Sequence, residues 1–199
     1  MSLHRMLAIC MAVALSACGS KNETHEGADE HAQHAPQAVD EQAPADQSGA
    51  SAVVQLAPTQ GNTVTGSLSL SAEENGVRLS GVVQGLKPNG EFGFHIHEKG
   101  DCSAPDASSA GGHFNPHNAE HGNPESDARH AGDMFNLRSD DQGTAQVDVL
   151  ARGVTLQTGE PTDVLGRAIV VHEGPDDYTS QPAGNSGARV ACGVIAPNG

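Results

Sequence analysis

Apolar and polar residues alternate along several short segments of this chain. The clearest alternation covers residues 64–70, 77–83 and 144–150, where Val, Leu and Ala are interleaved with Ser, Thr, Gly and Gln. Because successive side chains of a β-strand point to opposite faces, this alternation predicts half-buried strands. Turn signals at residues 74–76, 87–90 and 140–143 separate the strands at short intervals, which indicates an antiparallel sandwich or barrel.

Two further segments combine strand patterning with histidine. In Phe94–His97, the two imidazoles fall on one face about 6–7 Å apart, so both can reach one ion. Phe94 and Ile96 face the other way and are expected to pack in the core. His172 follows the apolar residues 168–171 and can bring a third imidazole from another strand. The same strands therefore serve both the fold and a candidate site.

Residues 111–133 are too rich in Gly, Pro and Asn for a helix and are predicted to form one long loop. Imidazole suits zinc and copper, and three histidines with one carboxylate complete a tetrahedral zinc shell. A single histidine is more often a surface or hydrogen-bonded residue, but the spacing of this set favours a two-metal site. Two four-coordinate ions need one ligand to bind both, and His113 is the natural bridge through its two ring nitrogens. The predicted ligands are His95, His97, His113, His121, His130, Asp133 and His172.

Several motifs stand in a fixed order along the chain. They are Gly93-Phe94-His95-Ile96-His97-Glu98, Gly112-His113-Phe114-Asn115-Pro116, Arg129-His130-Ala131-Gly132-Asp133, Val171-His172-Glu173 and Gly187-Ala188-Arg189-Val190-Ala191-Cys192-Gly193-Val194-Ile195. In order and spacing they resemble the copper/zinc superoxide dismutases, and the likeness covers roughly residues 53–197. A match of linked motifs in order is far more specific than a match to any one of them.

The resemblance implies an all-β fold, an eight-stranded antiparallel Greek-key barrel or sandwich with long metal-binding loops. It assigns copper to His95, His97, His113 and His172, and zinc to His113, His121, His130 and Asp133. One copper ion and one zinc ion per chain are therefore expected. The implied enzyme converts superoxide to oxygen and hydrogen peroxide by copper redox cycling, with His113 holding a proton between the two half-reactions.

The resemblance also suggests two supporting residues. Arg189 is expected to dock superoxide beside copper, because its guanidinium keeps its charge and offers a planar set of donors. Asp176 is expected to tie a copper histidine to a zinc histidine and so fix the orientation of both rings. The neighbouring Asp177 is an alternative for that role, whereas His117 lies outside the family pattern and is predicted to be a surface residue.

Residues 1–18 are predicted to be a cleaved lipoprotein signal. His4 and Arg5 precede the apolar residues 6–15, a run too short to span a bilayer comfortably. The run ends in Leu15-Ser16-Ala17-Cys18, which resembles a bacterial lipobox in which Cys18 becomes the lipidated N-terminus; an ordinary secretory peptide is the alternative. Gly19, rather than Asp, follows Cys18 and favours the outer membrane. A periplasm-facing protein held to the cell envelope by a lipid is expected.

Residues 19–50 read as a disordered acidic tether, because they contain almost no bulky apolar side chains that could form a core. Their histidines, His25, His31 and His34, are either a metal-capturing tail or incidental residues of a solvated linker. Residues 51–199 form the predicted β domain, which is long enough to bury an independent core. The resemblance is compatible with either a monomer or a homodimer, since bacterial relatives include both.

Cysteine usage is consistent with export. Cys10 leaves with the signal and Cys18 takes the lipid, so Cys102 and Cys192 remain. An oxidising compartment favours their pairing, and the resemblance places a disulfide there. Such a bond would tie the metal-binding region to the last strand.

Charge narrows the range of partners. Residues 51–199 contain 18 acidic and 8 basic residues, a formal charge of −10, which argues against nucleic acid. A uniform negative field would also repel superoxide, and residues 173–188 contain no Lys or Arg. Steering therefore requires local focusing by the metal ions, by Arg189 and by Lys99.

Three rival functions are weighed against dismutation. An exported copper-storage protein with this fold would be expected to offer Met and Cys ligands, yet Met134 is the one methionine after the signal. A zinc hydrolase with Glu98 as general base needs an open zinc position, which four protein ligands would fill. A metal-stabilised adhesion domain gives Arg189 no purpose.

Overall fold

The segments in which apolar and polar residues alternate form antiparallel strands, as predicted. The computed structural model describes residues 49–198. Apart from Val64 and Thr144, which directly precede their strands, the three alternating segments lie in β2 (Thr65–Glu73), β3 (Gly76–Gln84) and β7 (Ala145–Arg152). In β2, Leu68 and Leu70 are buried while Ser67, Ser69 and Ser71 on the opposite face are exposed. The period of two in the sequence therefore marks the inward and outward faces of the sheet.

The remaining strands are shorter or follow less regular patterns. They are β1 (Ser51–Pro58), β4 (Glu91–Phe92), β5 (Phe94–His97), β6 (Leu137–Arg138), β8 (Ala168–His172), β9 (Arg189–Val194) and β10 (Ala196–Pro197). The one helical element among residues 49–198 is the 3-10 turn η1 (Ser108–Ala110). The described part of the chain is thus all-β, as expected.

Eight strands form one curled sheet. Seven follow the order β5-β8-β9-β1-β2-β3-β7, and β10 pairs with the start of β1. The named strands of residues 49–198 all pair antiparallel, and β9 returns beside β1 although most of the chain separates them. The short strands β4 and β6 pair with each other and precede β5 and β7, the two ends of the order. This non-sequential antiparallel order agrees with the implied Greek-key fold, with β4 and β6 as an additional small ladder.

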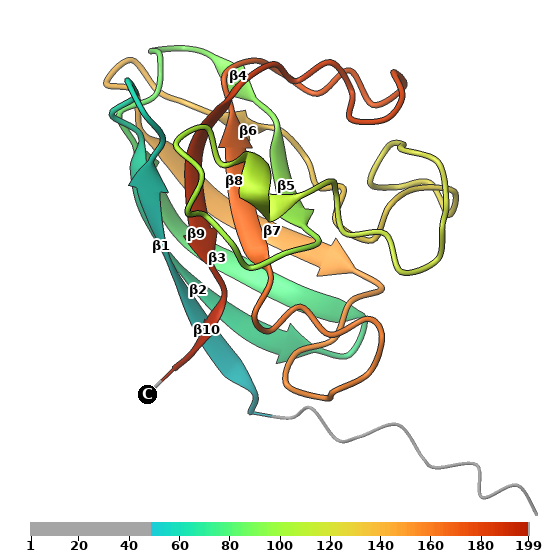
Figure 1. Cartoon of the computed structure of the whole chain (residues 1–199). Helices are drawn as coiled ribbons and strands as arrows, with labels where there is room; N and C mark the ends of the chain where they lie inside the picture. Colours follow the sequence, from blue (N-terminus) through green and yellow to red (C-terminus); the bar gives the residue numbers. More distant parts are fainter. Residues whose placement is uncertain (1–48, 199) are drawn as a thin grey trace, which may run out of the picture. The chain divides into compact units, whose positions relative to one another are not determined.

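The core lies between two layers of this curled sheet. Figure 1 shows β5, β8 and β9 on one side and β2, β3 and β7 on the other. Fully buried Leu68, Leu79 and Val54 meet Phe94, Ile96 and Ile169 in a single apolar cluster. Val, Leu and Ile supply most of this packing, because the whole chain has no Trp and only four Phe. Phe94 and Ile96 therefore pack in the core as their strand position predicts.

What the sequence predicts for the segments outside the described residues remains a prediction. The lipoprotein signal, Cys18 and the histidines of the tether lie outside residues 49–198. Within residues 49–198, no helix has the length and apolar character needed to cross a membrane.

Candidate metal centre

Six imidazoles and one carboxylate converge at one edge of the sheet. They form two overlapping groups whose ligand atoms lie within 4.8 Å of one another, and all members are buried. The first group is His95, His97, His113 and His172; the second is His113, His121, His130 and Asp133. His113 is the shared member. The structure therefore brings together both sets that the sequence predicts.

Three of these histidines are placed by the sheet itself. His95 and His97 project from the same face of β5, which pairs with β8 over its whole length. His172 ends β8 at a point where the register with β9 shifts, so that it lies opposite Arg189. Such irregularities re-aim side chains out of the regular pleat. The strands thus hold three ligands rigidly, at positions that depend on strand pairing.

The metal loop, residues 111–133, is hydrogen-bonded to the free edge of β5. The backbone N–H of Ile96 donates to the carbonyl of Gly132, and the N–H of Phe114 donates to the carbonyl of Ile96. Gly132 in turn donates to Phe114 over 2.9 Å. The approach at Gly132 is so close that a Cβ there would overlap the carbonyl oxygen of Ile96. A glycine is required here because only it lets the loop lie directly on the strand.

The ring nitrogens of the first group that face each other have no hydrogen-bond partner within residues 49–198. In the first group these are His95 Nδ1 and the Nε2 atoms of His97, His113 and His172. In the second group, the Nδ1 atoms of His113, His121 and His130 all face Asp133 Oδ1, at 2.8, 3.1 and 3.3 Å. Buried polar atoms without partners are costly. The donor set, all nitrogen on one side and three nitrogens with one oxygen on the other, fits copper and zinc respectively.

Outer contacts fix the opposite ring nitrogens. His97 Nδ1 lies 3.0 Å from the carbonyl of Gly111, and His172 Nδ1 lies 3.1 Å from the carbonyl of Gly187. Because a carbonyl oxygen only accepts, both Nδ1 atoms carry the proton, which leaves each Nε2 free as a ligand. The backbone therefore selects the tautomer that metal binding needs.

Asp176 joins the two groups. Its carboxylate accepts from His95 Nε2 at 2.7 Å and from His121 Nε2 at 2.9 Å, and it is fully buried. Asp177 instead is exposed and accepts from Thr179 and Ser180 of its own turn. Of the two neighbouring acids, only Asp176 contacts the candidate ligands.

Burial and neighbouring charges give the histidines of the metal-free site different protonation states at neutral pH. Burial lowers the pKa of His113 to about 4, against the opposing effect of Asp133, and lowers the pKa of His172 to about 3. For His121, burial also lowers the pKa, but hydrogen bonds and charge interactions with Asp133 and Asp176 outweigh it and raise the pKa to about 9. At neutral pH, His113 and His172 are thus neutral, as ligands must be, whereas His121 carries a proton that a metal ion must displace.

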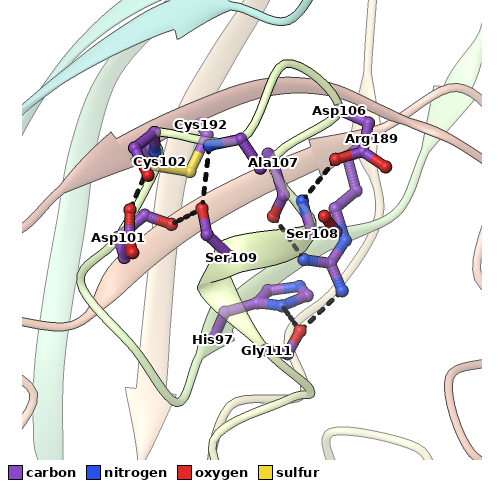
Figure 2. The surroundings of a disulfide bond; sticks show 12 residues. His97, Asp101, Cys102, Asp106, Ala107, Ser108, Ser109, Gly111, Arg189 and Cys192 are labelled. Atoms are coloured by element: carbon purple, nitrogen blue, oxygen red, sulfur yellow. Dashed lines mark hydrogen bonds between the residues drawn. A yellow bond between two sulfur atoms is a disulfide. The ribbon is translucent and has the colours of Figure 1, made fainter.

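Arg189 lies beside the first group and lines the same cavity. Its guanidinium donates to the carbonyls of Ala107 at 2.6 Å and Gly111 at 2.5 Å, as Figure 2 shows. A cavity of about 410 Å³ is lined by Arg189 together with His97, His113 and His172. The charged side chains around it are Arg189 and Glu98, whereas Lys99 does not line it and lies 4.0 Å from the Glu98 carboxylate. A cation therefore faces an open space next to the candidate copper ligands.

The comparison with known proteins decides the family. The model of the copper/zinc superoxide dismutase family matches residues 64–195, which contain every candidate ligand. The chain belongs to the copper/zinc superoxide dismutase family. A Cu-Zn superoxide dismutase of Aquifex aeolicus is 46% identical over 144 residues, which cover 71% of this chain and 84% of that protein.

One further relative matches nearly the whole chain, and a solved structure matches most of it. A superoxide dismutase-like protein of Bacillus subtilis is 35% identical over 201 residues and covers 98% of both chains. The crystal structure of a SOD-like protein from Bacillus subtilis has 39% identity and a TM-score of 0.66, and the match covers 72% of this chain and 97% of that one. The fold and the family are therefore shared, and membership of the family implies copper and zinc as the metals.

The predicted disulfide of this superoxide dismutase family member is present. Cys102 and Cys192 are bonded across 90 positions of sequence, with sulfurs 2.04 Å apart. The bond joins the segment before η1 to β9, close to the residues that hold Arg189 (Figure 2). His117, in contrast, is exposed and takes no part in either group, as predicted.

Sequence patterns miss several residues that position the site. The carbonyl of Gly111 accepts from both His97 and Arg189, but a carbonyl leaves no mark on sequence. The side-chain amide of Asn136 exchanges two hydrogen bonds with the backbone of Asp176. Gln181 makes the same kind of double contact with the backbone of His121. Contacts between distant segments decide these roles.

Proposed function

We propose that this protein is a superoxide dismutase that converts two superoxide anions and two protons to oxygen and hydrogen peroxide. One observation carries the proposal: the two ligand groups share His113, and Arg189 lines the same cavity as three ligands of the first group. Family membership supports the same activity. His95, His97, His113 and His172 would hold copper, and His113, His121, His130 and Asp133 would hold zinc. Bound copper supplies the one-electron redox chemistry, and zinc supplies fixed charge without redox change.

His113 is proposed to hold a proton at Nε2 between the two half-reactions. Its Nδ1 faces Asp133 at 2.8 Å, within the group assigned to zinc, so the ring stays anchored while Nε2 faces the first group. A proton held there lies beside the cavity in which peroxide forms.

Arg189 is proposed to dock the superoxide anion. Two of its N–H groups donate to the backbone, at Ala107 and Gly111, and fix the plane of the guanidinium. An arginine side chain has five N–H donors, and the remaining three have no acceptor among residues 49–198 and stay available for an anion. At about 4 Å, such a charge contributes roughly 4 kcal/mol near a protein surface, against about 1 kcal/mol in water.

Local charge must overcome the field of the whole domain. Residues 51–199 carry a formal charge of −10, and residues 173–188 add no cation. A cleft focuses the field of the charges that line it, and here Glu98 opposes Arg189. The cavity therefore depends on Arg189 together with the ions themselves to attract an anion.

The proposed location is the bacterial cell envelope. The lipobox ending in Cys18 supports a lipid anchor, and Gly19 supports the outer membrane, with residues 19–50 as a tether for a periplasm-facing enzyme. Removal of superoxide there would protect the envelope.

Metal analysis combined with a superoxide-consumption assay tests the proposed activity. The purified protein, loaded with both metals, should contain close to one copper and one zinc per chain and should consume superoxide. Removal of metal with a chelator should abolish the activity, and reloading should restore it. A protein that binds both metals but does not consume superoxide would instead be a copper-binding or storage protein.

A further inference from the structure

One wall of the cavity beside the candidate copper ligands, here called the copper cavity, is formed by the segment between β8 and β9. Residues 173–188, here called the mouth segment, connect β8 to β9 without forming a strand or helix. Pro182 and Ala183 of this segment line the cavity together with Arg189, His113 and His172. Where the mouth segment is held therefore decides the width of the opening.

Gln181, directly before that wall, contacts the metal loop through both ends of its side-chain amide. Its Oε1 accepts from the backbone N–H of His121 at 2.9 Å, and its Nε2 donates to the backbone carbonyl of His121 at 2.9 Å. Both hydrogen-bonding functions of the amide are thus used on one residue. This double contact fixes the separation of the two segments and also their relative orientation.

The mouth segment also contacts the side chain of His121. The imidazole of His121 donates through Nε2 to Asp176, while Gln181 holds its backbone. Gly184, with φ of 63°, accepts from the backbone N–H of Asp177 and closes the turn that carries Gln181. A Cβ at Gly184 would overlap the Asp176 carboxylate, so the turn packs directly against the Asp176–His121 pair. His121 is therefore enclosed by the segment that carries Pro182 and Ala183.

We infer that Gln181 is a positioning residue that couples the zinc ligand His121 to the wall of the copper cavity. Through this contact, ordering of the metal loop would also order Pro182 and Ala183. The inference deepens the proposed function and rests on it, because the cavity is taken as the entrance for superoxide. Gln181 is an exposed residue, so its role is not core packing, and its replacement is expected to leave the fold intact.

Two variants and one matched control test the inference in the metal-loaded protein. Gln181→Leu removes both hydrogen bonds at similar size, whereas Gln181→Glu keeps the acceptor and loses the donor. Gln55→Leu is the control, because Gln55 is also exposed and donates to another strand at Ser67, away from the metal loop. Thermal unfolding of all three verifies that each variant is folded.

Three readouts separate positioning from a general loss of stability. In Gln181→Leu, hydrogen exchange of the His121 amide and release of zinc to a chelator should both be about tenfold faster, the scale of one or two lost hydrogen bonds. The dissociation constant of azide, a small anion used as a spectroscopic probe of the copper site, should rise about threefold to tenfold. Gln181→Glu should fall between Leu and the parent, and Gln55→Leu should match the parent in all three.

Zinc release and amide exchange at the parent rate in Gln181→Leu would overturn the inference. Faster release with unchanged azide binding would overturn the coupling to the cavity wall. If the parent protein held both metals and failed to consume superoxide, the proposed function would fail, while faster exchange and release and weaker azide binding in Gln181→Leu would still support the coupling.

Discussion

Arg189 and His97 are joined through one acceptor, the carbonyl oxygen of Gly111. The guanidinium of Arg189 donates to it at 2.5 Å and Nδ1 of His97 lies 3.0 Å from it. The proposed anion-docking group and a proposed copper ligand are therefore positioned by the same backbone atom. A change in the loop near Gly111 would shift both at once, which links substrate docking to the geometry of the candidate copper site.

Arg189→Ala should lower the rate of superoxide consumption about tenfold to a hundredfold, because it removes an interaction of roughly 1.4–3 kcal/mol with the anion. Copper and zinc content should stay unchanged, since Arg189 is not a ligand. Arg189→Lys should recover part of the rate because it restores the charge without the planar fork, and Arg189→Glu should be slower than Ala.

Arg138→Ala is the matched control for Arg189, because it removes one positive charge from an exposed side chain paired with Glu91, outside the cavity. Steady-state assays and pulse radiolysis on the metal-loaded variants measure the rates of superoxide consumption. Parent-like rates in all Arg189 variants would exclude a docking role and would favour a copper-storage protein.

Asp176→Asn should weaken zinc binding about tenfold to a hundredfold, the usual effect of losing a partner behind metal-bound histidines. The carboxylate accepts from both His95 and His121, whereas an amide has one oxygen and would turn its N–H₂ group toward the other ring. Asp177→Asn is the control, since the Asp177 carboxylate accepts from Thr179, Ser180 and Asn185 and contacts no candidate ligand. Competition with a chromophoric zinc chelator measures the affinities, and equal loss in both variants would contradict the bridging role.

Zinc binding to the metal-free protein should release a proton from His121 at neutral pH. Burial lowers the pKa of His121, but Asp133 and Asp176 raise it to about 9, so the ring is protonated at pH 7. Apparent zinc affinity should therefore rise about tenfold per pH unit up to about pH 9 and then level off. Calorimetric titrations in buffers of different ionisation enthalpy measure the released proton.

The same group affects the stability of the metal-free protein. Because the folded pKa of His121 lies above its ordinary value of 6.5, its contribution is fully present below pH 6.5 and is lost as the pH rises toward 9. Neutral His113 and His172 provide the contrast, since their pKa values of about 4 and 3 predict no proton release above pH 6. Zinc affinity that does not change between pH 7 and 9 would contradict the protonation of His121.

Replacing both Cys102 and Cys192 by Ala should lower the free energy of unfolding of the metal-free protein. The disulfide spans 90 residues, and the chain-entropy model gives about 4–5 kcal/mol for a loop of this length. The rate should also fall, because the segment carrying Ala107 would hold Arg189 less firmly. Denaturant unfolding of the variant beside the oxidised parent measures the first effect, and a loss under about 1 kcal/mol would contradict it.

Cys18→Ala should release the protein from the membrane without changing its specific activity. Anchoring and chemistry are assigned to separate segments, since every candidate ligand lies at or after His95. Fractionation of cells followed by metal and activity measurements tests this expectation. A variant that stays in detergent-extractable membranes would count against the lipid anchor.

Local physics explains how much of the fold the sequence predicts. The inward and outward faces of β2, β3 and β7 and the shared face of His95 and His97 follow from the two-residue repeat of a strand. The sequence therefore predicts them before the neighbouring strands are known. The long loop follows from its Gly, Pro and Asn content. The metal sets could be predicted because ligand chemistry restricts residue types and the motifs keep their order.

Tertiary structure alone decided which neighbours complete the site. Asp176 and Asp177 are adjacent acids in the sequence, and only the fold turns the first toward His95 and His121. Lys99 was expected to help focus charge on the cavity, yet it does not line it. The contacts of Gly111 and Gln181 depend on segments brought together by the curled sheet and the disulfide. A residue's own chemistry is local, but the partners it meets depend on the packing of segments distant in sequence.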